Sequence, residues 1–408
     1  MTRLLLPAHE TTSAHLAGAF PWLAGGGTAV GPFLGNSMLD GSAFGYSPQA
    51  AYAAGDTTGP NVVIAGMVGR AKSSLVKVLV AYAVGMLGGH AVVLDPKGEY
   101  AQLADYLGRP SVRLRAGSGV RLNLLDGDRG SLPVVLAGIA RSALGRALDP
   151  VEDAGVAAAL TTAASLPGLL HLGTVADALL FPESEQADAL GFQGARALDQ
   201  LRDATRPVAL ALRHLVTTAL PGVVDGPTSP ELLDGRLLVL DLSGVGDDRA
   251  VRVCMAAAMR WSAATTSSGN GLLVADEAWR VLADPGAAEA AQAAWKLARA
   301  RGVAGVLVLH RLSDLDAVGP AGSRERAIAH GLVADSETRV LFGCEPREAD
   351  ALAAVCGLSD REITLTTGLP RGCALWRAGR RPSTPVRHRV PTALLPIVDT
   401  DGAMRGQA

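Results

Sequence analysis

The stretch VVIAGMVGRAKSSLVKVL, residues 62–79, joins a β-branched run to a segment of helical length through a glycine-containing loop. Its pattern is close to G-x-x-x-x-G-K-[ST], in which backbone N–H groups wrap a phosphate, the lysine binds the β- and γ-phosphates and the hydroxyl binds Mg²⁺. A strand before the loop and a helix after it place the phosphate at a helix N-terminus. This interpretation assigns nucleotide binding to Gly66, Met67, Val68, Gly69, Arg70, Ala71, Lys72, Ser73 and Ser74.

One residue of the loop departs from the pattern, because Ala71 stands where a glycine is expected. If this position requires a left-handed conformation, the methyl group costs on the order of 1–2 kcal/mol. That cost weakens phosphate binding without abolishing it. A glycine-containing turn between a strand and a buried helix has the same local pattern, so the loop alone leaves both interpretations open.

Composition limits the class of protein. The chain has 408 residues, 49% of them hydrophobic, and a formal net charge of -2. It can bury a large core, which argues against disorder, and its charge excludes a globally basic nucleic-acid binder while allowing a local basic patch. The four cysteines lie far apart without a C-x-x-C pair, which predicts core thiols in a reducing cytosol rather than a disulfide framework or a metal site.

Membrane insertion is not expected. The most apolar run, LVKVLVAYAVGMLGG at residues 75–89, contains Lys77 and is shorter than a membrane span requires. The LLLPA segment at residues 4–8 is too short for the apolar region of a signal peptide. We therefore expect a cytoplasmic protein with no integral membrane segment, which docks on a membrane complex only through partners.

Short apolar strands alternate with helical segments along much of the chain, which is typical of a parallel sheet covered by helices on both faces. The rhythm breaks at residues 132–231, where all segments have helical patterns, and this predicts an all-α insertion between two strands. The expected organisation is an irregular or short-β flap at 1–60, a sheet domain at 61–131 and 232–390, the insertion, and a tail at 391–408. The expected strands begin at Asn61, His90, Ser111, Arg236, Gly271, Gly305, Thr338, Gly372 and Pro385.

A second motif, LLVADEAW at residues 272–279, is an apolar strand that ends in two acids. If this strand lies beside the loop strand, Asp276 comes near Mg²⁺ through a water and Glu277 can polarise an attacking water. A strand that ends in solvated acids is the plainer alternative. Asp241, at the end of RLLVLD, is a rival of the same form, but it lacks an adjacent base.

The third motif, DPKGEY at residues 95–100, follows the second expected strand. The carboxyl ends of parallel strands form the ligand-binding edge of such sheets. Asp95, Lys97 and Glu99 are therefore further candidates, with Lys97 and Glu99 facing nucleotide or a neighbouring subunit. A Pro-Gly turn with two solvated charges is the alternative.

The fourth motif is the basic helix end in AAWKLARARGVAGVLVLH, residues 293–310. Cations at the end of a helix complement its dipole, which is a sufficient structural reason for Lys296, Arg299 and Arg301. The functional alternative is that Arg299 or Arg301 reaches the γ-phosphate held by an adjacent subunit. His310 ends the next strand and is placed to sense phosphate, although a capped strand-end histidine is equally consistent with its position.

Together these motifs resemble the HerA–FtsK branch of P-loop motor ATPases, and most of all the ATPases of conjugation and type IV secretion of the VirB and TraC type. The likeness covers about residues 31–390, and DPKGEY and DEAW are its most specific parts. The resemblance implies a RecA-like α/β fold and ATP with Mg²⁺ as cofactors. It also implies a homo-oligomer, expected to be a hexameric ring, that drives DNA or protein transfer with membrane-associated secretion components at the cytoplasmic face of the membrane.

Carried over by position, the resemblance implies that Lys72 and Ser73 bind phosphate and Mg²⁺ and that Asp276 holds the metal. It also implies that Glu277 activates water and that Arg299 or Arg301 acts on a neighbour's nucleotide. Ala71 departs from the family at the glycine, and His310 replaces the glutamine-like sensor. The region before Gly31 also leaves no room for the large N-terminal domain of many secretion ATPases.

Two other functions remain compatible with the motifs. One is a catalytically weak nucleotide-binding scaffold in a transfer complex, which Ala71 favours. The other is a HerA-like DNA translocase, in which arginine-rich loops such as GSRERA at residues 322–327 line the pore of a ring.

Overall fold

The computed structural model describes residues 30–398 apart from residues 128, 233–234, 266–269, 311–314, 316–317, 319 and 321. The first 29 residues of the expected N-terminal flap and the last ten of the expected tail lie outside this part of the chain. The described residues contain no helix long and apolar enough to cross a membrane. All four cysteines are buried and unpaired, as expected of core thiols.

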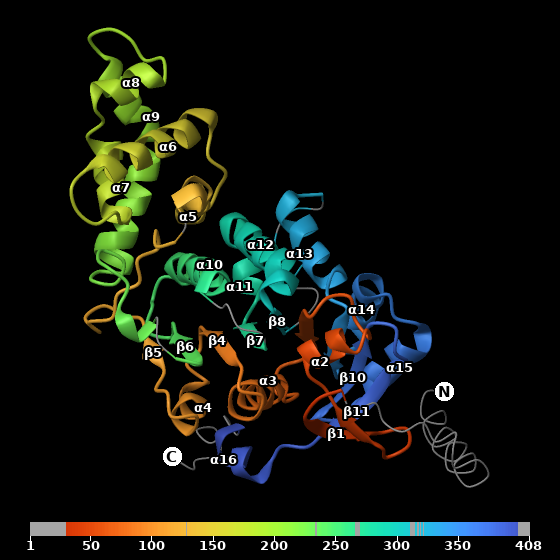
Figure 1. Ribbon diagram of the computed structural model, residues 1–408. Coiled ribbons are helices and arrows are strands. Elements are labelled where there is room, and N and C mark those ends of the chain that lie inside the picture. Colours follow the sequence, from red (N-terminus) through yellow and green to blue (C-terminus); the bar gives the residue numbers. More distant parts are fainter. Residues whose placement is uncertain are drawn as a thin grey trace.

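The architecture is one mixed sheet in the order β2-β1-β11-β10-β9-β3-β8-β7-β4-β6-β5 (Figure 1). The seven strands from β9 to β5 pair in parallel, whereas β10, β11, β1 and β2 extend the sheet by antiparallel pairing. The strands are β1 (Phe33–Ser37), β2 (Ala43–Gly45), β3 (Val62–Ala65), β4 (His90–Asp95), β5 (Val112–Arg113), β6 (Leu237–Asp241), β7 (Gly271–Ala275), β8 (Val303–Leu309), β9 (Thr338–Phe342), β10 (Cys373–Ala378) and β11 (Thr384–His388). The mostly parallel α/β fold predicted from the apolar runs is confirmed.

Helices cover both faces of the sheet. They are α2 (Pro48–Ala53), α3 (Lys72–Ala81), α4 (Ala101–Tyr106), α5 (Leu132–Leu144), α6 (Pro150–Ser165), α7 (Leu172–Leu180), α8 (Ser184–Ala189), α9 (Ala197–His214), α10 (Asp248–Thr265), α11 (Trp279–Leu282), α12 (Pro285–Arg301), α13 (Arg324–Ala334), α14 (Ala349–Cys356), α15 (Asp360–Gly368) and α16 (Leu395–Val398).

The alternation of side chains along the strands sorts the core into two clusters. On β3, Val63 and Ala65 belong to the cluster that packs on α10, α12 and α13, whereas Val62 and Ile64 face α2, α3 and α4. Successive side chains of a strand point to opposite faces, so a strand buried on both sides reads as a continuous apolar run. This is why the parallel strands were easy to find in the sequence.

The helices α5 to α9 lie between β5 and β6 in the chain and extend beyond one end of the sheet (Figure 1). α5 makes the connection to the sheet domain, because it packs on α10 and α12. The approach to α12 is close: a Cβ on Gly286 would lie 2.2 Å from the carbonyl oxygen of Gly138. Glycine at this crossing brings the two helix backbones together.

The two ends of the described chain are integrated into the sheet domain. β1 and β2 form its outer edge, so the segment expected as an irregular or short-β flap supplies edge strands of the main sheet. α16 packs on α3 and α4, where Lys77 Nζ donates a hydrogen bond of 3.0 Å to the carbonyl oxygen of Ile397. Residues 392–398 of the expected tail are therefore part of the packed structure.

Candidate nucleotide site

Strand register brings the sequence motifs to one edge of the sheet. Ala65 on β3 pairs with Leu309 on β8, and Ala275 on β7 pairs with Leu307 on β8 and Leu94 on β4. The four parallel strands therefore end together, and the loop, His310, the acidic pair and DPKGEY all start from that edge. This is the edge at which open α/β sheets bind ligands.

The condition under which the acidic pair was assigned its roles, a strand directly beside the loop strand, is not met. The strand that carries Asp276 and Glu277 does not lie beside the loop strand, because β8 separates β7 from β3. The inserted strand places His310 between the loop and the acidic pair. Strand order depends on long-range pairing, which local patterns do not encode.

The loop from Gly66 to Ala71 makes the turn that the glycines predict. Gly66 has φ 147°, and a Cβ there would lie 2.5 Å from Cβ of Phe342. Gly69 has φ 77°, and Ala71, at the N-cap of α3, has φ 77° and ψ 28°. Ala71 therefore adopts the left-handed conformation that glycine favours, which costs on the order of 1 kcal/mol for alanine.

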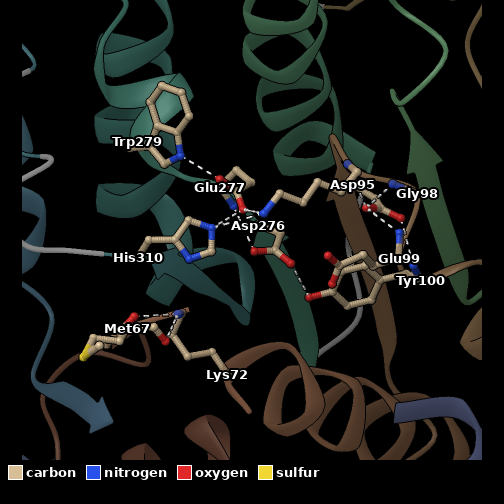
Figure 2. Close-up of polar contacts among 12 residues, drawn as sticks. Met67, Lys72, Asp95, Gly98, Glu99, Tyr100, Asp276, Glu277, Trp279 and His310 are labelled. Carbon is tan, nitrogen blue, oxygen red and sulfur yellow. Dashed lines mark hydrogen bonds and ion pairs between the residues drawn. The ribbon is translucent and has the colours of Figure 1, made fainter. Parts of the chain in front are cut away.

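Lys72 is buried and turns back onto its own loop. Its Nζ donates hydrogen bonds of 2.5 Å to the carbonyl oxygen of Gly66 and 2.9 Å to that of Met67 (Figure 2). A nucleotide phosphate therefore has to attract this ammonium group away from the two carbonyl oxygens. The loop is preformed in backbone shape, but its lysine is engaged.

One backbone and one side-chain hydrogen bond tie the loop to the segments that follow β9 and precede β10. The N–H of Met67 donates to Gly343 at 3.2 Å, and Arg70 Nη1 donates to the carbonyl oxygen of Leu369 at 3.4 Å. Val68 and Gly69 at the tip of the loop are exposed, and the side chain of Val68 is 73% exposed. The loop is thus anchored at both sides while its tip faces solvent.

The two serines at the start of α3 have different surroundings. Ser73 is partly exposed next to Lys72, on the first turn of the helix. Ser74 Oγ donates a hydrogen bond of 3.4 Å to the carbonyl oxygen of Val398, on α16. Ser73 is therefore the better placed of the two for a ligand at the helix N-terminus.

Glu277 is the centre of the polar cluster in Figure 2. It is buried and has φ 54°, and its Oε1 contacts both Lys97 Nζ and His310 Nε2. Its Oε2 accepts a hydrogen bond of 2.7 Å from Trp279 Nε1. Burial raises the pKa of this carboxyl, but the bonds from His310, Lys97 and Trp279 outweigh it and lower the pKa to about 2. Glu277 is therefore ionised and held on both oxygens.

Asp276 is also buried, and its side chain is fixed by two donors. The Tyr100 hydroxyl donates to Oδ2 at 2.8 Å, and the backbone N–H of Glu277 donates to Oδ1 at 2.9 Å. Burial raises the pKa of Asp276 above its usual value. The surroundings therefore stabilise the ionised form of Asp276 less than water does. A cation bound close to this carboxylate would favour the ionised form.

In the DPKGEY turn, Asp95 fixes the backbone of the turn, whereas Lys97 contacts the polar cluster around Glu277. Asp95 is buried and accepts backbone hydrogen bonds from residues 97–100, so it shapes the turn, and burial raises its pKa to about 6. Lys97 joins the cluster, with its Nζ 3.2 Å from His310 Nε2. Glu99 is partly buried on the same turn.

The rival acid Asp241 lies elsewhere. It ends β6, which β4, β7 and β8 separate from the loop strand. Its carboxylate accepts hydrogen bonds from Arg113 Nε at 2.6 Å and from Ser243 Oγ at 2.6 Å. This acid is engaged in local structure and stands apart from the loop.

Arg299 and Arg301 lie at the opposite edge of the sheet from the loop. They occupy the last turn of α12, directly before β8. The seven residues of β8 separate them from His310, which corresponds to roughly 20 Å of extended chain. These arginines are therefore far from the loop of their own chain.

The oxygen donors at this edge fit a magnesium ion that is shared with a phosphate. The Ser73 hydroxyl and the Asp276 carboxylate are hard ligands of the kind that Mg²⁺ takes, usually together with waters and substrate phosphates. Among the described residues, no group of three or more His, Cys, Asp or Glu side chains could hold a metal by itself. The donor set suits Mg²⁺ carried with nucleotide rather than a permanent protein-only site.

Sequence reasoning missed two hydrogen-bond partners of the candidate acids, Tyr100 at Asp276 and Trp279 at Glu277. Each is the aromatic residue that ends a quoted motif, DPKGEY and DEAW respectively. Both have an apolar ring and one polar donor, and a buried donor of this kind usually finds a partner. The aromatic residues could be noticed in the sequence, but their partners, Asp276 and Glu277, can be assigned only from the fold.

The parallel sheet, and the loop and acidic pair at the edge where its strands end, are those of a RecA-like P-loop ATPase fold. The family model described as Helicase HerA, central domain, matches residues 61–131, which contain both the loop and DPKGEY. The resemblance drawn from the motifs is confirmed at the level of the fold, by this model over residues 61–131 and by solved structures of the HerA–FtsK type.

Particular solved structures share this fold. VirB4 of Thermoanaerobacter pseudethanolicus matches with a TM-score of 0.71 and 19% identity, over 90% of this chain and 99% of that one. The plasmid coupling protein TrwB in complex with the ATP analogue ADPNP matches with a TM-score of 0.59 and 18% identity, over 85% and 86%. TrwB with ADP and Mg²⁺ matches with 0.57 and 17%, over 81% and 86%. No protein of curated function matches the sequence significantly.

Proposed function

We propose that this protein hydrolyses ATP as a motor of a conjugative DNA-transfer or type IV secretion system. The observation that carries the proposal is the convergence of Lys72, Glu277 and His310 at one sheet edge (Figure 2). A phosphate loop and a carboxylate that can orient water are the two parts that phosphoryl transfer to water needs. The structures of TrwB with ADP and Mg²⁺, with ADPNP and with the GTP analogue GDPNP support a nucleoside triphosphate as the ligand, and we take ATP as the substrate.

In the proposed reaction, Lys72 leaves the loop carbonyls and binds the β- and γ-phosphates. Glu277 then orients a water and takes its proton as the water attacks the γ-phosphorus atom, and ADP leaves. His310 follows the neighbouring strand and contacts Oε1 of Glu277, and this contact orients the carboxylate. Ser73 and Asp276 would hold Mg²⁺, which supplies neutralisation of phosphate charge when bound.

The proposed assembly is a homo-oligomer, a hexameric ring, in which Arg299 or Arg301 completes the site of the neighbouring subunit. Their place at the start of β8, roughly 20 Å of extended chain from His310 at the nucleotide edge, supports action in trans, because neither arginine lies at the edge that binds the nucleotide of its own chain. The partners proposed are DNA and membrane-associated secretion components, at the cytoplasmic face of the membrane.

Two substitutions test the proposed chemistry. Lys72→Ala removes the phosphate ligand and should abolish both nucleotide binding and hydrolysis. Glu277→Gln keeps the side-chain size and should retain binding while hydrolysis falls by roughly 10²–10⁴-fold. Lys296→Ala, an exposed lysine on α12, serves as the charge-matched control and should retain activity. Wild-type rates in both site variants would overturn the proposal.

Mixing experiments test the arginines. An Arg299→Ala or Arg301→Ala chain still binds ATP but fails to serve its neighbour, so adding it to wild-type protein should lower activity more than dilution does. The variant that poisons the wild type identifies the trans-acting arginine. A loss of activity in simple proportion to the added variant would contradict action in trans.

Two observations favour the second candidate, a catalytically weak nucleotide-binding scaffold. Ala71 is held at φ 77°, and Lys72 and Glu277 are both engaged by protein groups. Tight ATP binding measured by calorimetry, with no phosphate release in the presence or absence of DNA, would select the scaffold over the motor.

A further inference from the structure

Both carboxylate oxygens of Glu277 are occupied by protein groups. Oε1 contacts Lys97 Nζ and His310 Nε2, and Oε2 accepts the bond from Trp279 Nε1. A general base must have an oxygen within hydrogen-bond reach of the proton that it takes. Oε1 is the more crowded of the two oxygens, because two nitrogen groups contact it, and a water gains room at Oε1 when one of them leaves.

Of the three partners, Lys97 is the one best able to leave. Its side chain is 43% exposed, compared with 22% for that of His310. The backbone of its turn is held by Asp95, so movement is confined to a flexible four-carbon side chain. Trp279 lies two residues from Glu277 at the start of α11 and moves with it.

The phosphate loop leaves the strand next to the one that His310 follows, and His310 is a neighbour of Lys97. Because Ala65 pairs with Leu309, the next residues, Gly66 and His310, leave neighbouring strands side by side. Lys97 Nζ is 3.2 Å from His310 Nε2. A terminal phosphate on the loop brings more than one negative charge to this place, and it competes with a single carboxylate for the ammonium group.

We propose that Lys97 is the residue that distinguishes nucleoside triphosphate from diphosphate. Lys97 holds Glu277 in the nucleotide-free and diphosphate-bound protein and moves onto the γ-phosphate when a triphosphate binds, which frees Oε1 of Glu277 for water. This inference rests on the proposed ATP site. It assigns to DPKGEY a coupling between the presence of the γ-phosphate and the availability of the base.

Trp279 gives a direct optical measure of this exchange, since its indole N–H is bonded to Glu277. The full chain is titrated with ADP and with ADPNP, each with Mg²⁺, while tryptophan fluorescence is recorded. The wild type should respond to ADPNP and not to ADP, and Trp279→Phe should lose the ADPNP response although tryptophans 22, 261, 295 and 376 remain.

Calorimetric affinities test the role of Lys97 itself. Lys97→Met should weaken ADPNP binding at least tenfold while leaving ADP binding unchanged, so that the affinity ratio falls. Lys97→Arg keeps the cation and should keep most of the ratio, and Lys296→Met is the matched control with a wild-type ratio. In Lys97→Met, the Trp279 signal should no longer separate ADPNP from ADP.

The outcomes separate this inference from the proposed function. A wild type that binds neither nucleotide overturns both. A wild type that binds and hydrolyses ATP, with a wild-type affinity ratio and Trp279 response in Lys97→Met, overturns the role of Lys97 alone. Loss of the ratio in Lys97→Met with its retention in Lys97→Arg supports the inference.

Discussion

The hydroxyl of Tyr100 donates a hydrogen bond of 2.8 Å to Oδ2 of Asp276. The bond joins the DPKGEY turn to the end of β7, two segments that lie 176 residues apart in the chain. Burial raises the pKa of Tyr100 well above its usual value, so the phenol remains a donor at all working pH values. The position of the proposed metal ligand thus depends on an aromatic residue from another strand's loop.

The first prediction concerns this bond. Tyr100→Phe leaves a buried carboxylate without one of its two donors and should lower the free energy of unfolding by about 1–3 kcal/mol. Tyr106→Phe, which alters an exposed tyrosine on α4, is the matched control and should change little. Urea unfolding monitored by circular dichroism measures both. Equal stability of the two variants would show that the bond to Asp276 contributes nothing.

The second prediction concerns Ala71. Ala71→Gly removes a methyl group from a left-handed residue and should stabilise the loop by about 1 kcal/mol and speed ATP turnover. Ala54→Gly is the control: Ala54 has φ -75°, so glycine there should lose stability. Thermal unfolding and steady-state phosphate release check the two effects. An Ala71→Gly enzyme no faster than the wild type means that this alanine does not limit turnover.

The third prediction concerns the contact between α5 and α12. Gly286→Ala would put a Cβ 2.2 Å from the carbonyl oxygen of Gly138, and should destabilise the protein by about 1–3 kcal/mol. Gly331→Ala on α13 meets nothing within 4 Å and should instead stabilise by about 0.5–1 kcal/mol. Opposite signs in thermal unfolding support the close crossing, whereas two stabilising substitutions would argue against it.

The fourth prediction concerns pH. Burial lowers the pKa of His388 to about 4, and its Nε2 accepts a hydrogen bond of 2.9 Å from Trp376 Nε1. Between the usual histidine pKa of about 6.5 and this lower value, the unfolded chain binds a proton that the folded chain does not. The contribution of His388 to stability is therefore complete above about pH 6.5 and declines as the pH falls toward 4.

His388→Gln removes this titration and keeps an acceptor for the indole. The loss of melting temperature between pH 7 and pH 5 should be smaller in the variant than in the wild type. The carboxyl groups and the other histidines titrate in both proteins alike, so the difference between the two curves isolates His388. Parallel curves would mean that His388 has an ordinary pKa.

The sequence predicted the parallel strands well because each is buried on both faces and reads as a short apolar run, as in β4 and β7. It did not predict that β1 and β2 extend the sheet, because they are strands of five and three residues in a glycine-rich segment. Nor did it predict that β8 lies between β3 and β7. Pairing order follows from packing across the whole chain rather than from any local pattern.

The candidate site shows the same division. Gly66, Lys72 and Glu277 could be found from spacing and strand ends, because those patterns report chemistry directly. The contact between Lys97 and Glu277 could not, since it joins residues 180 positions apart at the ends of two strands, β4 and β7, whose pairing no local pattern encodes. The left-handed backbone at Ala71 was a conditional expectation, and the structure has it.

The fifth prediction is the measurement that tests the central proposal most directly: the steady-state ATPase rate as a function of protein concentration, with and without duplex DNA. Sites completed by a neighbour's arginine require assembly, so the rate per chain should rise with concentration and then level off. Stimulation by DNA that weakens with salt would point to a DNA cargo. A rate strictly proportional to concentration, unchanged in Arg299→Ala and Arg301→Ala, would contradict a ring-forming motor.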